Sequence, residues 1–210
     1  MKYKISIITC FIILIVTFVA EAQHKSRFIQ HNLKHGISVQ IPSHWQVIEK
    51  QVMDQIDTNT ELLTKVPQGD NNILIAANYI VSNEILATVR ISVRIRTTFT
   101  QDDIKNTSQA EIDKKDILSR TQVVNALEQM NDKTTKVSAF KTTKEILSGY
   151  SCMRTDYQLI YPSKIMNTSI YVIYLGNKAV KMTLSYEEKH KALLKTSIDK
   201  IIGSLSLKDL

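Results

Sequence analysis

A strict alternation of apolar and polar residues from Thr88 to Thr97 is the feature that most limits what this chain can fold into. The apolar positions are Val89, Ile91, Val93 and Ile95, and the polar positions between them are Arg90, Ser92, Arg94 and Arg96. Because successive side chains of a strand point to opposite sides, this period of two predicts a β-strand with one face against a core. The other face of the strand is basic.

Further segments of the sequence are also predicted to be strands. They cover residues 27–31, 37–41, 73–81, 136–142, 149–161, 168–175 and 179–186. Pro42 ends the second of these segments because proline has no N–H to donate to a ladder. Turns are expected at Gly36 and at Gly176-Asn177, since these residues tolerate positive φ.

Helices are predicted in three parts of the chain. Residues 51–65 are compatible with one helix, and residues 187–204 form an amphipathic one whose apolar stripe is Leu194, Ile198, Ile201 and Leu205. A long helical stretch starts after Thr100, which is placed to cap it. We expect this stretch to form two helices, with an irregularity near residues 116–120.

The N-terminus has the pattern of a secretory signal peptide. Lys2 and Lys4 precede an apolar run that ends at Ala20, and small residues stand at Ala20 and Ala22, where signal peptidase requires them. We therefore assign residues 1–22 to a leader cleaved after Ala22, and residues 23–210 to a single domain. An uncleaved membrane anchor and a lipoprotein acylated at Cys10 are the alternatives.

Charge and cysteine content narrow the class of protein. The formal net charge is +7, of which the leader contributes +1 (Lys2 and Lys4 against Glu21), so residues 23–210 carry 7 − 1 = +6. A positive net charge of this size favours association with anionic surfaces. The charged residues are scattered along the sequence, however, which is also typical of a protein whose charges only keep it soluble. Only Cys152 follows the leader, which excludes an intramolecular disulfide. Its strand-like neighbours favour a buried structural thiol over a reactive one.

The candidate binding residues are arginines on predicted strands. Arg90, Arg94 and Arg96, joined by Arg154 from a neighbouring strand, could form a face that binds an anion or a partner, because guanidinium groups match carboxylate and phosphate geometry. If helices cover this face, the arginines pair instead with acidic residues of the protein. Both interpretations are kept.

No catalytic or cofactor-binding motif is found in the sequence. Nucleophile elbows, phosphate-binding glycine loops and the zinc-protease motif are all absent from it. His24, His31, His35 and His44 cluster in sequence, but no acidic ligand is evidently paired with them, so we assign no metal site. We accordingly expect no catalytic residue, no cofactor and no specific nucleic-acid binding.

Two segments resemble the PsbP/Mog1-like domain family. Residues 36–45, Gly-Ile-Ser-Val-Gln-Ile-Pro-Ser-His-Trp, are similar to the strand and Pro-x-x-Trp corner that open these domains. Residues 174–205, which end Ile-Ile-Gly-Ser-Leu, are similar to the hairpin and helix that close them. The resemblance implies an α+β fold, with a central antiparallel β-sheet sandwiched by helices, and members that are generally not enzymes. The leader places the chain with the exported bacterial members.

These observations together indicate an exported protein of the periplasm or the secreted fraction that acts by binding. We expect an accessory protein of the bacterial cell envelope whose partner is another envelope protein. The alternative is a carrier for a small anionic ligand or lipid that uses the basic sheet face. An enzyme ranks third.

The predicted leader can be tested directly. N-terminal sequencing of the exported protein is expected to begin at Gln23, because cleavage after Ala22 removes residues 1–22. A mature protein that still begins with Met1 would contradict both the cleavage site and the predicted location.

Overall fold

The computed structural model of the protein describes residues 27–49, 52, 71–130, 132 and 134–208. The predicted leader, with Ala20 and Ala22, lies outside the described residues, as does all of the predicted 51–65 helix except Val52. Within the described part of the chain, no helix is long and apolar enough to span a membrane. The strands are β1 (Phe28–Asn32), β2 (Ile37–Pro42), β3 (Gln46–Val47), β4 (Asn71–Val81), β5 (Glu84–Ile95), β6 (Lys136–Leu147), β7 (Tyr150–Ile160), β8 (Ile165–Tyr174), β9 (Lys178–Glu187) and β10 (Ser206–Leu207). The helices are α3 (Gln101–Asn106), α4 (Gln109–Gln129), the 3₁₀ turn η1 (Glu188–His190) and α5 (Lys191–Ser204).

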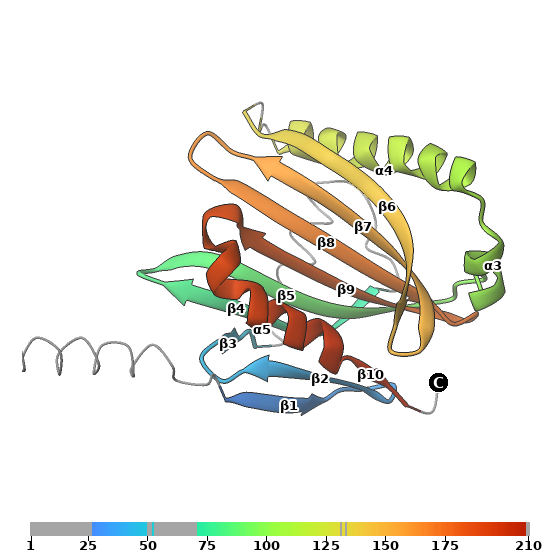
Figure 1. Ribbon diagram of the computed structural model, residues 1–210, viewed down its shortest axis with the longest axis horizontal. Coiled ribbons are helices and arrows are strands. Elements are labelled where there is room, and N and C mark those ends of the chain that lie inside the picture. The colour runs from blue at the N-terminus through green and yellow to red at the C-terminus, as the bar shows by residue number, and fades with distance from the viewer. Residues whose placement is uncertain (1–26, 50–51, 53–70, 131, 133, 209–210) are drawn as a thin grey trace, which may run out of the picture.

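Two sheets organise the described chain. The larger one has seven strands in the order β3-β4-β5-β9-β8-β7-β6, all paired antiparallel. The smaller one has three strands in the order β1-β2-β10, so that it joins segments from opposite ends of the chain. Figure 1 shows the small sheet beside the lower strands of the large one, next to α5.

The alternation in β5 divides the large sheet into two faces. Val89, Ile91 and Val93 are fully buried on one side, which we call the front face. There they pack with β2 and with α5, whose inward stripe is Leu194, Ile198 and Ile201. This confirms the predicted core face of β5 except at its end, where Ile95 is 45% exposed.

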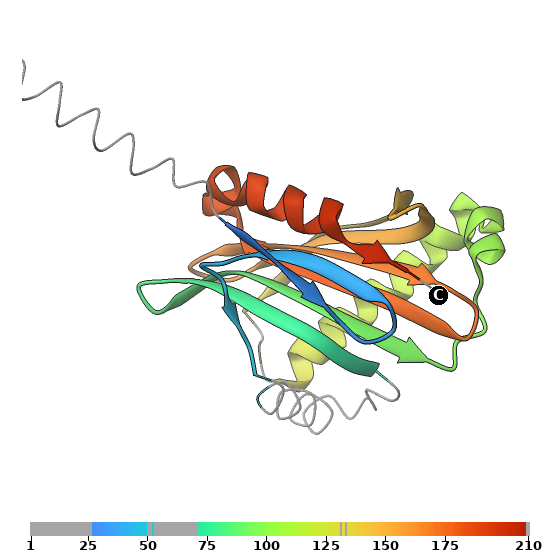
Figure 2. The same ribbon diagram turned by 90° about the horizontal axis from the view of Figure 1, so that it is seen from below.

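Helix α4 runs on the side of the sheet opposite α5, which we call the rear face (Figure 2), and α3 packs against the same face at the end of the sheet. Ile104 of α3 and Ile112 of α4 are fully buried there with Met153 of β7. Asp116 of α4 accepts a hydrogen bond of 2.8 Å from the backbone N–H of Thr142 on the edge strand β6. The helix thereby satisfies a donor that an open sheet edge would leave exposed. The predicted antiparallel sheet between helices is confirmed.

The break in the long helical stretch is at residues 107–108, not near residues 116–120 as predicted. Ser108 has extended backbone angles, and its hydroxyl accepts from the N–H of Glu111 while the Glu111 carboxylate accepts from the N–H of Ser108. Thr100 and Asp103 form the same reciprocal capping box at the start of α3. A second cap inside the stretch starts a new helix, and α4 then runs uninterrupted through residues 116–120.

The hairpin between β1 and β2 depends on a glycine. Gly36 has a φ of +63°, and the carbonyl oxygen of Lys208, just after β10, lies 1.9 Å from the position that a Cβ on Gly36 would occupy. The N–H of Lys208 donates to the Gly36 carbonyl at 2.9 Å. The predicted turn at Gly36 is confirmed, and the structure adds a reason for glycine: the end of the chain passes over it.

Gly36→Ala is expected to destabilise the protein by at least about 2 kcal/mol, because it adds both left-handed strain and a clash with the backbone of Lys208. Gly149→Ala is the matched control: Gly149 also has positive φ (+82°), but nothing lies within 4 Å of its added Cβ. It should cost only about 1 kcal/mol. Urea unfolding measures both values, and equal losses for the two variants would show that the contact with Lys208 is unimportant.

Candidate functional site

The four arginines singled out from the sequence do not share one surface. Arg154 pairs with Tyr171, Tyr171 with Met182, and Met182 with Ile91, and directly paired residues point to the same side of a sheet. Arg154 is therefore on the front face. Arg90 and Arg94 occupy the alternate positions of β5 and lie on the rear face.

The expectation that all four arginines share one basic face is therefore corrected. The physical reason is that alternate residues of a strand point to opposite faces of the sheet. The sequence gives the spacing within β5 and within β7 but not the register between them, and a shift of one residue moves a side chain to the other face. Arg96 lies beyond the end of β5 with a φ of +63°, and its N–H donates to the Asn177 carbonyl at 2.8 Å. The alternation that was predicted to include Arg96 therefore ends at Ile95, the last residue of β5.

Arg154 is held by two carboxylates of the sheet. Its Nε is 2.9 Å from Oδ2 of Asp156, and its Nη1 is 3.1 Å from Oε1 of Glu145. Burial opposes the charged form of Arg154, but its neighbours, Tyr171 and Asp156 first among them, outweigh burial and raise the arginine pKa. Ser169 donates a hydrogen bond of 2.5 Å to Oδ1 of Asp156. The guanidinium is thus fixed in position and its charge is compensated.

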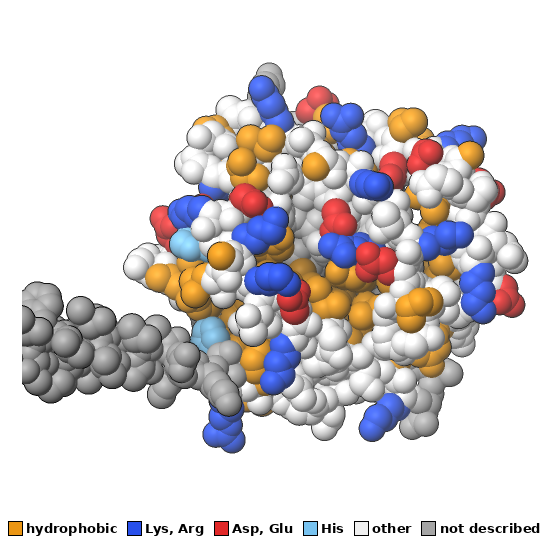
Figure 3. Space-filling view, in the orientation of Figure 1, with side chains coloured by type: hydrophobic (Ala, Val, Ile, Leu, Met, Phe, Trp, Pro, Cys, Tyr) orange, Lys and Arg blue, Asp and Glu red, His pale blue; other side chains and the backbone are white. Residues whose placement is uncertain are grey.

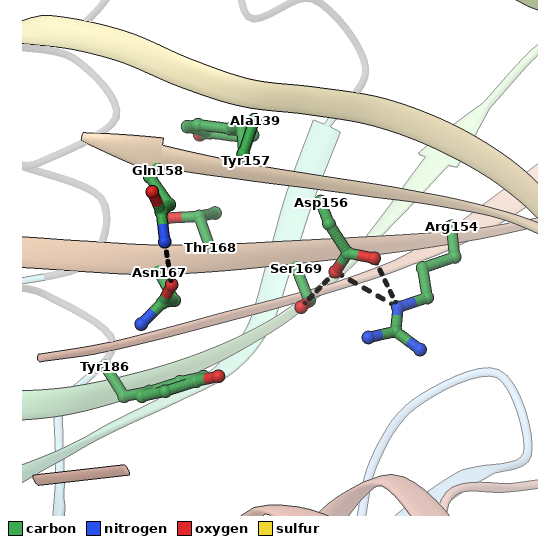
Figure 4. Close-up of a pocket in the computed structure, with 9 residues that line it drawn as sticks. All are labelled: Ala139, Arg154, Asp156, Tyr157, Gln158, Asn167, Thr168, Ser169 and Tyr186. Atoms are coloured by element: carbon green, nitrogen blue, oxygen red, sulfur yellow. Dashed lines mark hydrogen bonds and ion pairs between the residues drawn. The ribbon is translucent and has the colours of Figure 1, made fainter. Parts of the chain in front are cut away.

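A hollow of about 240 Å³ opens beside this group on the front face, over β7, β8 and β9 (Figure 4). Its lining is mostly polar and includes Arg154, Asp156, Gln158, Asn167, Ser169 and Tyr186. Gln158 donates to the side-chain oxygen of Asn167 at 3.0 Å, and Asn167 in turn donates to the Glu188 carboxylate. A network of side-chain hydrogen bonds therefore fixes the polar floor of the hollow.

A second hollow of about 200 Å³ continues the first toward α5. The two share Arg154, Ser169 and Tyr186. The second adds the apolar side chains Tyr171, Leu184, Ile198 and Ile202, with Lys191, Lys195 and Asp199 of α5 also in its lining. Together the two hollows, defined by these residues, form one continuous depression that we call the front groove.

The front groove is open because α5 covers only part of the front face. In Figure 1, α5 crosses in front of β9, and the end of the β6–β7 hairpin curls in front of the right-hand ends of β8 and β9. The left-hand parts of β7 and β8 stay uncovered. Figure 3 shows acidic and basic side chains meeting over the middle of this face, around a recess. Burial raises the pKa of the Tyr186 phenol and raises that of Tyr171 to about 12, so both hydroxyls stay protonated and can donate hydrogen bonds.

The other candidates from the sequence are not part of the groove. Cys152 is fully buried in the front core, as predicted for a structural thiol, and burial raises its pKa to about 11. Burial also lowers the pKa of His31 and His44, and the His44 ring contacts Tyr79 edge-on. Within the described ranges, no group of three His, Cys, Asp or Glu residues is placed to hold a metal ion. His24 lies outside those ranges.

Sequence reasoning missed most of the groove, although a signal was present. Arg154, Asp156 and Gln158 alternate along β7, and Asn167 and Ser169 alternate along β8. A run of polar residues at every second position marks a strand face that is not packed into a core. Of these residues only Arg154 was predicted, because its positive charge marks a binding residue, whereas polar side chains at every second position of a strand mark one only together.

No family model and no curated protein matches the sequence, but solved structures resemble its fold. The solution structure of PsbP (CyanoP) from the cyanobacterium Synechocystis has a TM-score of 0.53 and 8% identity, and the match covers 87% of this chain and 93% of that one. LpqN of Mycobacterium tuberculosis, described as involved in cell envelope biogenesis, gives 0.46 and 10%, covering 90% and 95%. The Ran-binding protein Mog1p of Saccharomyces cerevisiae gives 0.43 and 10%, covering 88% and 97%.

The likeness to CyanoP shows that this chain has the PsbP/Mog1-like fold. The sequence resemblance had implied this fold from the Pro-x-x-Trp corner and the closing hairpin and helix. In the structure, Trp45 of that corner is buried and stacks on Tyr79 with 6.0 Å between ring centroids. At 8% identity the likeness concerns the fold alone.

Cys152 is expected not to react with iodoacetamide at pH 8 in the folded protein. With a pKa of about 11, the thiol is protonated at that pH, and the side chain is fully buried. Labelling followed by mass spectrometry should show modification only as urea unfolds the protein. Complete labelling within minutes in native buffer would instead identify an accessible, reactive thiol.

Proposed function

We propose that the protein is exported and acts in the cell envelope without catalysis, by binding a segment of another envelope protein in the front groove. The observation that carries this proposal is an open stretch of sheet whose hydrogen-bonding side chains are already held in place. Arg154, Asp156, Asn167 and Ser169 are fixed by one another or by their neighbours. Binding to such a preorganised surface costs little side-chain entropy.

The shape of the front groove favours a protein segment over a small molecule. Its two hollows, of about 240 and 200 Å³, lie side by side on an open sheet face, whereas small-molecule sites are usually clefts that bury most of the ligand surface. Two shallow hollows joined by a shared rim are instead suited to successive side chains of an extended chain. Tyrosine and arginine at the junction, here Tyr186 and Arg154, are residue types enriched at protein interfaces.

The charges in the groove also weigh against a small anion as its ligand. Arg154 already has two carboxylates within 3.1 Å, so its positive charge is neutralised before any ligand arrives. A small anionic ligand or lipid bound on the rear face through Arg90 and Arg94, with Arg96 just beyond the end of β5, is the alternative proposal. Loss of a co-purifying anion on changing Arg90 and Arg94 to Gln would favour that alternative.

The proposal predicts that a partner can be crosslinked from the groove. The photoreactive residue p-benzoylphenylalanine, placed at position 186 in cells of the native host, is expected to crosslink to one protein, because the Tyr186 ring lines both hollows. Gel mobility and mass spectrometry identify the product.

Position 118 provides the matched control. Leu118 is exposed on α4, away from the groove, and replacing it with the same photoreactive residue should not disturb the fold. The proposal requires a product that appears from position 186 and not from position 118. The same product from both positions, or none from position 186, would contradict it.

A further inference from the structure

The charge balance of the front groove runs against that of the whole protein. Ionisable side chains that line the groove, or are paired with its lining, are three cations and four anions, a sum of 3 − 4 = −1. The cations are Arg154, Lys191 and Lys195, and the anions are Glu145, Asp156, Glu188 and Asp199. The sequence as a whole carries +7. Among its lining and ion-paired groups, the groove therefore has one negative charge in excess. Lys141 of the edge strand β6, opposite Asp156 in the sheet, stands outside this set.

The acidic groups are accessible and keep acceptor capacity. The Asp156 and Glu145 side chains are 40% and 38% exposed, compared with 33% for the arginine between them. An ionised carboxylate has about four lone-pair sites. In Glu145, Oε1 accepts a hydrogen bond from Arg154. A cation arriving from solvent thus meets oxygen atoms that can still accept hydrogen bonds.

The lysines of α5 do not reverse this balance. Lys191 is 3.6 Å from a Glu188 oxygen, and Lys195 is 2.5 Å from Asp199. Each lysine is therefore matched by its own carboxylate, one turn away on the helix surface. The carboxylate in excess belongs to the Glu145–Arg154–Asp156 group at the middle of the groove.

An apolar wall lies directly beside this acidic group. In the hollow that shares Arg154 with its polar neighbour, Leu184 and Ile198 are buried in the floor, and Ile202 is the half-buried side chain that a ligand would contact. The Tyr186 ring lines both hollows, where its face could also receive a cation. A bound segment would meet an apolar surface and a carboxylate pair within a few residues of each other.

We infer that the front groove selects an extended protein segment in which an apolar side chain is followed closely by a basic one. The apolar side chain would lie against Ile202 of α5. The arginine or lysine would contact Asp156 from its solvent side, next to the Tyr186 ring, because Arg154 already lies between Glu145 and Asp156. This inference rests on the proposed function and names the chemistry of its partner. Complementary charge of this kind sets which partner is accepted more than it sets total affinity.

Three blocked tripeptides test the charge preference in the purified exported protein. They are acetylated, amidated Leu-Ser-Arg, Leu-Ser-Gln and Leu-Ser-Glu, titrated while the amide shifts of Asn167, Ser169 and Tyr186 are followed by ¹⁵N NMR. The arginine peptide is expected to bind at least about threefold more tightly than the glutamine peptide, and the glutamate peptide more weakly than both. Raising the salt concentration should shrink the difference.

Removing the acidic pair should reverse the order. In the double variant Glu145→Gln with Asp156→Asn, Arg154 loses both carboxylates, so the glutamate peptide should become the preferred one. The control Asp102→Asn with Asp113→Asn makes the same change in net charge on exposed parts of α3 and α4, and should keep the original order. If the double variant does not fold, Glu145→Gln alone should reduce the preference for arginine.

The outcomes separate this inference from the proposed function. Equal binding of the three peptides, preference for the glutamate peptide, or no shift at the groove residues would overturn the inference. A crosslink from position 186 would still support the proposed function in each of those cases. Conversely, arginine preference without any crosslinked partner would leave the groove's selectivity in place and remove its proposed role.

Discussion

The fully buried row on β5 is the constraint on which the rest of the structure depends. Val89, Ile91 and Val93 need an apolar cover on the front face, and neither α5 nor the small sheet supplies it alone. The two elements share the task because β2 packs against α5 as well as against the large sheet. Burial of a Val or Ile side chain contributes about 1.5–3 kcal/mol, so this row anchors both elements.

The front groove stays open because α5 and the small sheet together cover only part of the front face. α5 lies in front of β9 and the small sheet lies beside β4 and β5, and neither element extends over the left-hand parts of β7 and β8 (Figure 1). In the uncovered part, the side chains of β7 and β8 that point to the front face are polar. In β5 and β9, the side chains that point to the same face are apolar. One sheet face is thus a core at one side and a hydrogen-bonding surface at the other, and the groove lies where the two meet.

Much of the fold could be predicted because local patterns report local structure. Alternation located β2, β5 and the closing strands, and Thr100 and Gly36 marked a helix start and a turn that the structure confirms. The site could be predicted far less well. Whether Arg154 joins Arg90 depends on strand register across β7, β8, β9 and β5, and no local pattern contains it. The helix break was misplaced for a related reason: the cap at Ser108 outweighed the apolar spacing that suggested a later irregularity.

The small sheet has a consequence for the order of folding. Its pairing of Ser38 with Ser206 joins segments that are far apart in the sequence, and contacts of this kind pay a large loop-closure entropy before they gain any stability. The hairpin of β1 and β2 can form early, but its third strand is added only after the large sheet and α5 have brought the two ends together. The core is therefore expected to be completed last at the place where β2 meets β10 and α5.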